Sequence, residues 1–115
     1  MTPRVQKAVE ALFIGASQRD MDIPQFIASH GLDTMLVHPA SLRSPILISE
    51  GQSGTVVPLI RTALGVEVAY RILPRYFEGQ GDFLFVKEFE ITRLPEMELV
   101  GSEWVVRQKG RIDHI

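Results

Sequence analysis

The last third of the chain, residues 79–115, constrains the fold more than any other stretch because most of it reads as β-strand. Long apolar, aromatic and β-branched runs there are interrupted by Pro and Gly, a pattern typical of a sheet built from hairpins. We expect an antiparallel meander that turns at residues 94–96 and 109–110. Its strands are predicted at residues 82–92, 97–108 and 111–115. The preceding residues would then cover one face of that sheet.

The first thirty residues carry the signals of two helices. Pro3 suits the first turn of a helix, and the apolar residues after it recur at helical spacing, which predicts a helix over residues 3–18. Asp22 is placed to accept hydrogen bonds from the free N–H groups of a second helix, predicted over residues 23–29.

The middle of the chain mixes strand and helix signals. We predict short strands at residues 35–38 and 45–49, a third helix at 56–63 and a long strand at 66–77. Pro74 cannot donate to a β-ladder, so an edge, a bulge or a bend is expected there. This order of elements predicts an α+β fold in which a curved, mostly antiparallel sheet of about six strands wraps around the N-terminal helices.

Length and charge narrow the class of protein. A chain of 115 residues makes a single domain, 1–115, with one core. The formal charge is −2 with Lys and Arg scattered along the sequence, which argues against nucleic acid or a membrane surface as partner. No apolar run approaches the roughly 20 residues of a membrane span, and the N-terminus lacks a signal peptide, so a cytoplasmic location is expected. The absence of Cys excludes disulfides and thiolate zinc sites.

Four short strings, taken with the order of elements, resemble the SnoaL-like and nuclear-transport-factor-2-like superfamily. They are Ala-Ser-Gln-Arg-Asp-Met-Asp at 16–22, Val-His-Pro at 37–39, Ser-Gly-Thr at 53–55 and Val-Val-Arg-Gln-Lys-Gly-Arg-Ile at 105–112. This superfamily includes ketosteroid isomerases, limonene epoxide hydrolases and polyketide cyclases. The resemblance implies a cone-shaped fold, a largely apolar cavity between helices and sheet, and a homodimer formed through the outer sheet face.

The resemblance to the isomerases also implies site positions. Their general-base aspartate, which precedes a proline, corresponds to His38. Their oxyanion-hole acid falls near Ser102 or Glu103, and their helix-one tyrosine corresponds to Leu12 or Phe13, neither of which can donate a hydrogen bond.

The resemblance to the epoxide hydrolases points to a different strand. Their Arg-x-Asp pair corresponds to Glu88 and Glu90, so Glu90 is a candidate base, while the activating arginine is replaced by Glu88. Their second aspartate would lie beyond Ile115. Neither known catalytic set is complete, so any chemistry would be a variant.

Two readings of His38 follow from its own properties. It ends an apolar strand and titrates near neutrality, so it is a candidate acid or base, but a strand-end histidine bonded to backbone fits the same sequence. The other two histidines, His30 and His114, are far from it in sequence and share no ligand spacing, so we expect neither a metal site nor a cofactor.

Glu88 and Glu90 share one face of their strand because side chains alternate. If that face points inward, burial and mutual repulsion would raise at least one pKa and give an acid and a base. If the aromatic residues of the strand point inward instead, both carboxylates lie in water. The resemblance favours inward carboxylates, with the aromatic face used for self-association.

Two functional hypotheses result. The first is a cofactor-independent lyase, isomerase or hydrolase that acts on a small apolar substrate, with His38 and Glu90 as acid and base and Glu88 tuning them. The second is a module that binds a ligand or dimerises without chemistry. The residues expected to contact a ligand are Tyr70, Trp104 and Glu103, although aromatic residues of this kind are also common in cores.

Overall fold

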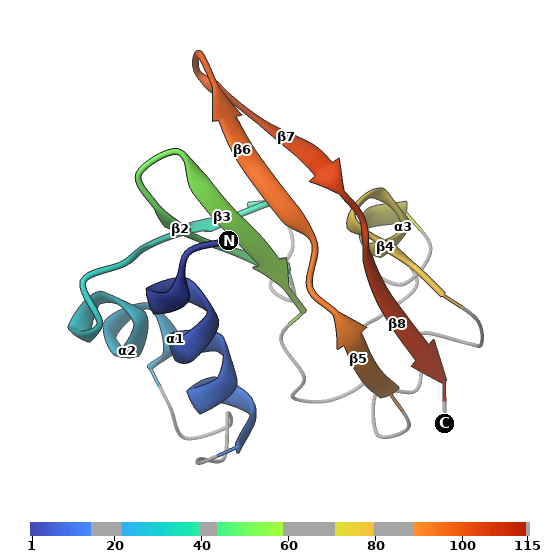
Figure 1. Ribbon diagram of the computed structural model, residues 1–115, viewed down its shortest axis with the longest axis horizontal. Helices are drawn as coiled ribbons and strands as arrows, with labels where there is room; N and C mark the ends of the chain where they lie inside the picture. The colour runs from blue at the N-terminus through green and yellow to red at the C-terminus, as the bar shows by residue number, and fades with distance from the viewer. Residues whose placement is uncertain (15–21, 40–43, 59–70, 80–88, 115) are drawn as a thin grey trace.

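The computed structural model describes residues 1–14, 22–39, 44–58, 71–79 and 89–114. Two short helices lie against one face of a five-stranded sheet, and a three-stranded sheet continues from one side of it (Figure 1). All strand pairs but one are antiparallel among these residues, and the sheets do not close into a barrel. The predicted α+β class with a mostly antiparallel sheet is therefore confirmed.

The N-terminal helices form where the sequence predicts them. Helix α1 spans Pro3–Ile14 and α2 spans Ile23–Ser29. The side chain of Asp22 accepts a hydrogen bond of 3.2 Å from the backbone N–H of Gln25, which satisfies one of the free donors at the start of α2. The last four residues of the helix predicted over 3–18 lie outside the described residues.

The five-stranded sheet has the strand order β1-β2-β3-β6-β7. Its strands are β1 (Asp33–Leu36), β2 (Ile46–Glu50), β3 (Ser53–Val57), β6 (Glu96–Val100) and β7 (Glu103–Gln108). The strand predicted at 45–49 is confirmed within one residue at each end, whereas the strand predicted at 35–38 lies two residues earlier in the chain.

The three-stranded sheet has the order β4-β8-β5 and contains the one parallel pair, β4 with β8. Its strands are β4 (Phe77–Glu78), β5 (Phe89–Arg93) and β8 (Gly110–His114), and helix α3 (Leu73–Tyr76) precedes β4.

Residues 89–114 form one long, bent hairpin that runs through both sheets (Figure 1). Strand β5 pairs with β8 and β6 pairs with β7, so the chain reverses at Gly101, where φ is +65°. The turns predicted at 94–96 and 109–110 are therefore wrong, because the chain does not reverse at either segment. Each segment instead interrupts one arm of the hairpin, and the two interruptions lie opposite each other. Pro95 has no N–H to continue the ladder, and the register shifts next to it.

Two other predictions are wrong for local reasons. Residues 56 and 57 do not begin a helix but end β3, where Val57 pairs with Ile46 and both β-branched side chains are buried in the sheet. Residues 73–76 form helix α3 and not a strand, and Pro74 lies in its first turn, where a missing N–H costs little. Most of the remainder of these two predicted elements falls within residues 59–70, which lie outside the described residues.

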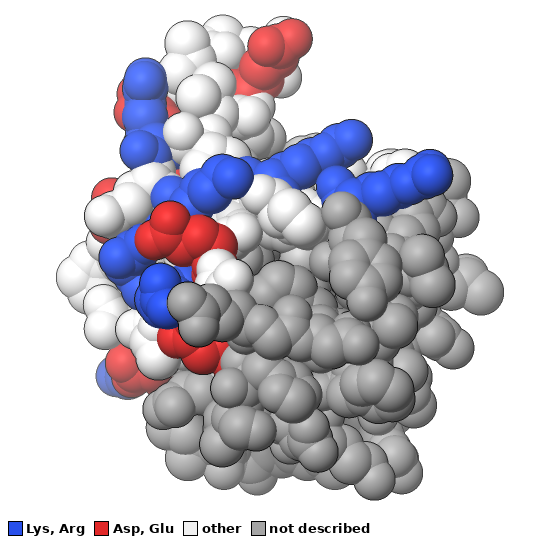
Figure 2. Space-filling model, turned by 90° about the vertical axis from the view of Figure 1, so that its right-hand side faces the viewer, with Lys and Arg blue, Asp and Glu red and all other residues white. Residues whose placement is uncertain are grey.

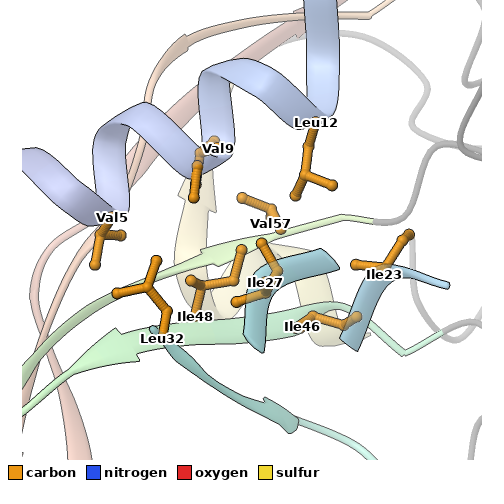
Figure 3. Close-up of a cluster of buried hydrophobic side chains, with 10 residues drawn as sticks. Val5, Val9, Leu12, Ile23, Ile27, Leu32, Ile46, Ile48 and Val57 are labelled. Carbon is orange, nitrogen blue, oxygen red and sulfur yellow. The ribbon is translucent and has the colours of Figure 1, made fainter. Parts of the chain in front are cut away.

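The main core lies between the N-terminal helices and the sheet (Figure 3). Ile46 and Ile48 on β2 point toward the helices, and Leu47 between them points to the opposite face, as strand alternation requires. The labelled side chains that meet here are Val5, Val9, Leu12, Ile23, Ile27, Leu32, Ile46, Ile48 and Val57. The helices thus cover one face of the five-stranded sheet and leave the other face for a separate, smaller cluster.

Candidate functional site

The face of the five-stranded sheet opposite the N-terminal helices carries an open groove of about 320 Å³. This volume is at the lower end of the range for small-molecule sites. We call it the Trp104 groove, and it is lined by Met35, Val37, Leu47, Tyr76, Met97, Ser102, Glu103 and Trp104.

The strand register explains why the apolar strand residues of the lining share a face. Residues directly opposite each other in an antiparallel ladder point to the same side of the sheet. Met35 lies opposite Leu47 on one side of the groove, and Trp104 lies opposite Leu99, two residues after Met97. Because β1 and β7 are the outermost strands of this sheet and both contribute lining residues, the sheet must curve around the groove.

The groove has a closed apolar floor and an open mouth. Leu47 and Met97 are buried, and with Val56 they form a cluster against which Tyr76 and Trp104 are half-buried. Met35 is 48% exposed and so lies at the mouth. Thioether side chains adapt to ligand shape, and Tyr and Trp combine a large apolar surface with a hydrogen-bond donor.

The polar groups of the groove come mainly from the start of β7 and the turn before it. Ser102 and Glu103 are exposed there, next to Trp104. Glu103 is the one charged residue among the described lining residues. It pairs with Val100 and is adjacent to Trp104 in β7, so its side chain points to the opposite face of the sheet.

The structure brings two of the six predicted site residues together, since Glu103 and Trp104 line the same groove. His38 is half-buried just after β1, and its backbone N–H donates a hydrogen bond of 2.9 Å to the hydroxyl oxygen of Ser44. The backbone of Glu90 pairs with Asp113 in the three-stranded sheet. The other two predicted residues, at positions 70 and 88, lie outside the described residues. His38 is not among the described residues that line the Trp104 groove.

Several lining residues were not predicted from the sequence. Met35, Leu47, Tyr76 and Met97 all line the groove. Side chains alternate between the two faces of strand β2. Because Ile46 and Ile48 face the helices, Leu47 between them faces the groove, and this alternation is a signal that could have identified it. Tyr76 gives no such signal, since its position depends on α3 replacing the predicted strand.

The groove also differs from the cavity that the family resemblance implies. That cavity would lie between the helices and the sheet, where the described residues form an apolar core. The groove lies on the other face, walled by α3 and the outermost strands.

A second hollow, of about 340 Å³, lies beside β3, β6 and β7 and is lined mostly by charged and polar side chains. Its carboxylates are paired: Glu98 lies 2.8 Å from Arg107, Glu96 lies 3.7 Å from the N-terminal amine, and Glu50 lies 3.1 Å from Arg4, outside the lining. The pKa of Arg107 is raised above its ordinary value because Glu98 accepts its hydrogen bond and adds an opposite charge nearby. Paired groups of this kind leave little charge for a ligand.

Basic side chains form a row on the side of the molecule seen in Figure 2, with acidic side chains next to part of the row. On the three-stranded sheet, Arg93 lies 2.7 Å from Glu78, and Arg111 lies 2.9 Å from Asp113. Lys109 donates a hydrogen bond of 2.8 Å to the carbonyl oxygen of Pro74. This surface is thus of mixed charge and carries several internal contacts.

Comparisons with known proteins find no match to the chain among family models, curated proteins or solved structures. Within the described residues, no helix has the length and apolar character needed to cross a membrane. The same residues contain no group of three or more His, Asp or Glu side chains placed to hold a metal ion.

Proposed function

We propose that the Trp104 groove binds a small, largely apolar molecule and that binding, without acid–base catalysis, is the function of this domain. The observation that supports it is the groove itself, with a buried floor of Leu47 and Met97 and aromatic walls of Tyr76 and Trp104. Sites for small molecules are typically concave and mostly apolar, with a few polar groups at defined positions.

Binding is favoured over catalysis by where the described catalytic candidates lie. Acid–base catalysis needs a titratable group within hydrogen-bond reach of the substrate. His38 follows β1 outside the lining, and the backbone of Glu90 belongs to the other sheet. A ligand in the groove would instead gain from burying apolar surface, at about 25 cal/mol per Å².

Trp104 makes the proposal testable because it is the only tryptophan in the chain. Its indole N–H gives a single resonance, and its fluorescence reports on one place. We expect neutral probes such as cyclohexanol to shift that resonance in a saturable manner.

A matched pair of variants locates the binding. Met35 and Val100 are equally exposed, at 48% and 47%, but only Met35 lines the groove. Met35→Lys should weaken cyclohexanol binding by placing a charge at the mouth, and Val100→Lys should leave it unchanged. A series of neutral apolar probes that never saturates the Trp104 signal would rule the proposal out.

Self-association is a second candidate function, and the outer strand β1 favours it. Met35 and Leu36 are 48% and 44% exposed on this strand, which ends the strand order of the described sheet. Exposed edge strands pair readily with other chains. A homodimer would form by antiparallel pairing of two β1 strands. The aromatic strand face that the sequence predicts for dimerisation lies mostly outside the described residues.

Light scattering coupled to size exclusion tests the dimer. The wild-type chain should elute as a dimer, and Leu36→Lys should shift it to a monomer that keeps the fold. A wild-type monomer at high concentration would contradict this candidate without affecting the binding proposal.

A further inference from the structure

We infer that the ligand of the Trp104 groove is an uncharged compound with an aromatic ring; this inference rests on the binding function proposed above. The groove has two aromatic walls that come from different elements, Tyr76 from α3 and Trp104 from β7. Both side chains are half-buried and pack against the floor of Leu47, Val56 and Met97. A ligand above this floor would therefore lie beside two aromatic side chains.

The two aromatic walls have no ring partner among the described residues. The ring contact found there is that of Phe26 with His30, whose centroids lie 4.7 Å apart on the helix side of the sheet. Aromatic rings attract one another at centroid distances of about 4.5–7 Å, beyond what their apolar area contributes. Tyr76 and Trp104 line one groove without such a contact, so an aromatic ligand would gain ring contacts that a saturated ligand of the same size cannot make.

Thioether side chains favour the same ligand class. Met97 is 4% exposed and belongs to the floor, whereas Met35 is 48% exposed at the mouth. The polarizable sulfur of methionine makes favourable contacts with aromatic rings at a distance of about 5 Å. A ring bound in the groove would thus have a methionine at the bottom and another at the rim.

The described residues supply no charge to the inside of the groove. Glu103 is the one charged residue of this lining, and it points to the opposite face because it pairs with Val100 and is adjacent to Trp104 in β7. A charged ligand would lose hydration on entering without gaining an opposite charge from these residues. The preferred ring compound is therefore uncharged.

A matched pair of alcohols tests for the ring. Benzyl alcohol and cyclohexylmethanol carry the same hydroxymethyl group, but only the first is aromatic. Benzyl alcohol is also the more water-soluble of the two, so transfer from water alone would favour cyclohexylmethanol. Titrations followed by the Trp104 indole resonance should show benzyl alcohol binding about fivefold more tightly, the gain expected from one good ring contact. Benzoate and benzylammonium, its charged relatives, should bind more weakly than benzyl alcohol at pH 7.

The methionine methyl resonances locate the bound ring. An aromatic ring shifts the proton resonance of a neighbouring methyl group by its ring current, whereas a cyclohexyl ring does not. Benzyl alcohol should therefore shift the methyl resonances of Met35 and Met97, and cyclohexylmethanol should shift them much less. The resonance of Met35 is identified by its loss in Met35→Leu.

Three variants assign the preference to the groove. Tyr76→Leu should reduce the ratio of the two dissociation constants by about half or more, because one aromatic wall is lost. Met35→Leu, at an exposed position where the fold is not at risk, should also reduce the ratio. Phe26→Leu is the matched control, because Phe26 is half-buried like Tyr76 but lies on α2 at the other face of the sheet. It should keep the wild-type ratio. Circular dichroism of the variants verifies that the fold is retained.

The outcomes distinguish the two claims. The aromatic inference is overturned, while the binding function stands, if cyclohexylmethanol binds as tightly as benzyl alcohol or if a charged relative binds best. The same holds if Tyr76→Leu and Met35→Leu both keep the wild-type ratio, or if neither methionine shows a ring-current shift. If no neutral probe moves the Trp104 resonance in a saturable manner, both the inference and the proposed function fail.

Discussion

The hydroxyl of Thr55 donates a buried hydrogen bond of 2.7 Å to the backbone carbonyl oxygen of Pro95, across 40 positions of sequence. Thr55 lies in β3, and Pro95 lies where the long hairpin bends from β5 into β6. A buried carbonyl needs a partner, and the bend interrupts the ladder near this one. The contact therefore ties the bend of the hairpin to the centre of the five-stranded sheet.

Replacing Thr55 with Val should lower the free energy of unfolding by about 1–3 kcal/mol, because the shape is kept while the carbonyl of Pro95 loses its donor. The measurement is the urea midpoint at constant m-value. Thr92→Val is the control, since the Thr92 hydroxyl is exposed and lies 3.5 Å from its acceptor. Equal stability of the two variants would show that the contact is not needed at the bend.

Gly110 should not tolerate a side chain. An added Cβ would lie 2.6 Å from the carbonyl oxygen of Arg93 and 2.7 Å from the Cδ of Pro95, so the two arms of the hairpin would have to separate. Overpacking of this kind typically costs about 1–3 kcal/mol. Gly110→Ala should therefore lower the thermal midpoint and increase amide exchange in β8.

Gly51→Ala provides the comparison for that variant. Nothing lies within 4 Å of its added Cβ, but φ is +61°, so only the cost of a left-handed backbone, about 1 kcal/mol, is expected. Amide exchange in β8 should stay as in the wild type. If Gly110→Ala behaves in the same way, the close approach at the bend does not constrain this position.

Ile48→Ala should be among the most damaging substitutions in the sheet, with a loss of about 2–5 kcal/mol. Ile48 lies on β2, and its side chain is completely buried against the N-terminal helices. Met35→Ala, at an exposed position, should change stability by less than about 0.5 kcal/mol. Chemical unfolding of both variants checks the contrast, and a small loss for Ile48→Ala would mean that the helices pack elsewhere.

The ion pair of Arg107 and Glu98 should stabilise the fold weakly and equally at pH 7 and pH 10. The raised pKa of Arg107 means that its stabilising contribution is complete below the unfolded-state value and is lost only as the pH rises through the folded-state value. Arg107→Gln should thus show the same small loss at pH 7 and pH 10, and the loss should shrink in 1 M salt. Arg107→Lys is the control that keeps the charge. A loss that vanishes between those two pH values would contradict this account.

Local chemistry made part of the fold predictable. Helix α2 has the predicted bounds because Asp22 caps it by accepting a hydrogen bond from the residue three positions later. The sequence alone specifies a contact of such short range. Strand β2 is predictable for a similar reason, since its apolar run is bounded by Pro45 and Gly51. The sequence also predicts Glu103 and Trp104 as ligand contacts, and both line the groove, although Glu103 points to the opposite face and the role of Trp104 is still a proposal.

Pairing partners were not predictable from the sequence. Pro95 and Lys109 look like hairpin turns when read locally, but the pairing of β5 with β8 makes both of them bends in longer arms. Helix α3 likewise replaces a predicted strand, and this brings Tyr76 to the groove.

The sequence by itself determined the α+β class, the N-terminal helices and strand β2, because each depends on interactions between near neighbours along the chain. Only the tertiary structure decided that Met35 and Trp104, on the outermost strands, line one groove. Tertiary contacts such as that of Thr55 with Pro95 join residues far apart in sequence and leave no local pattern, so near neighbours along the chain cannot reveal such an arrangement.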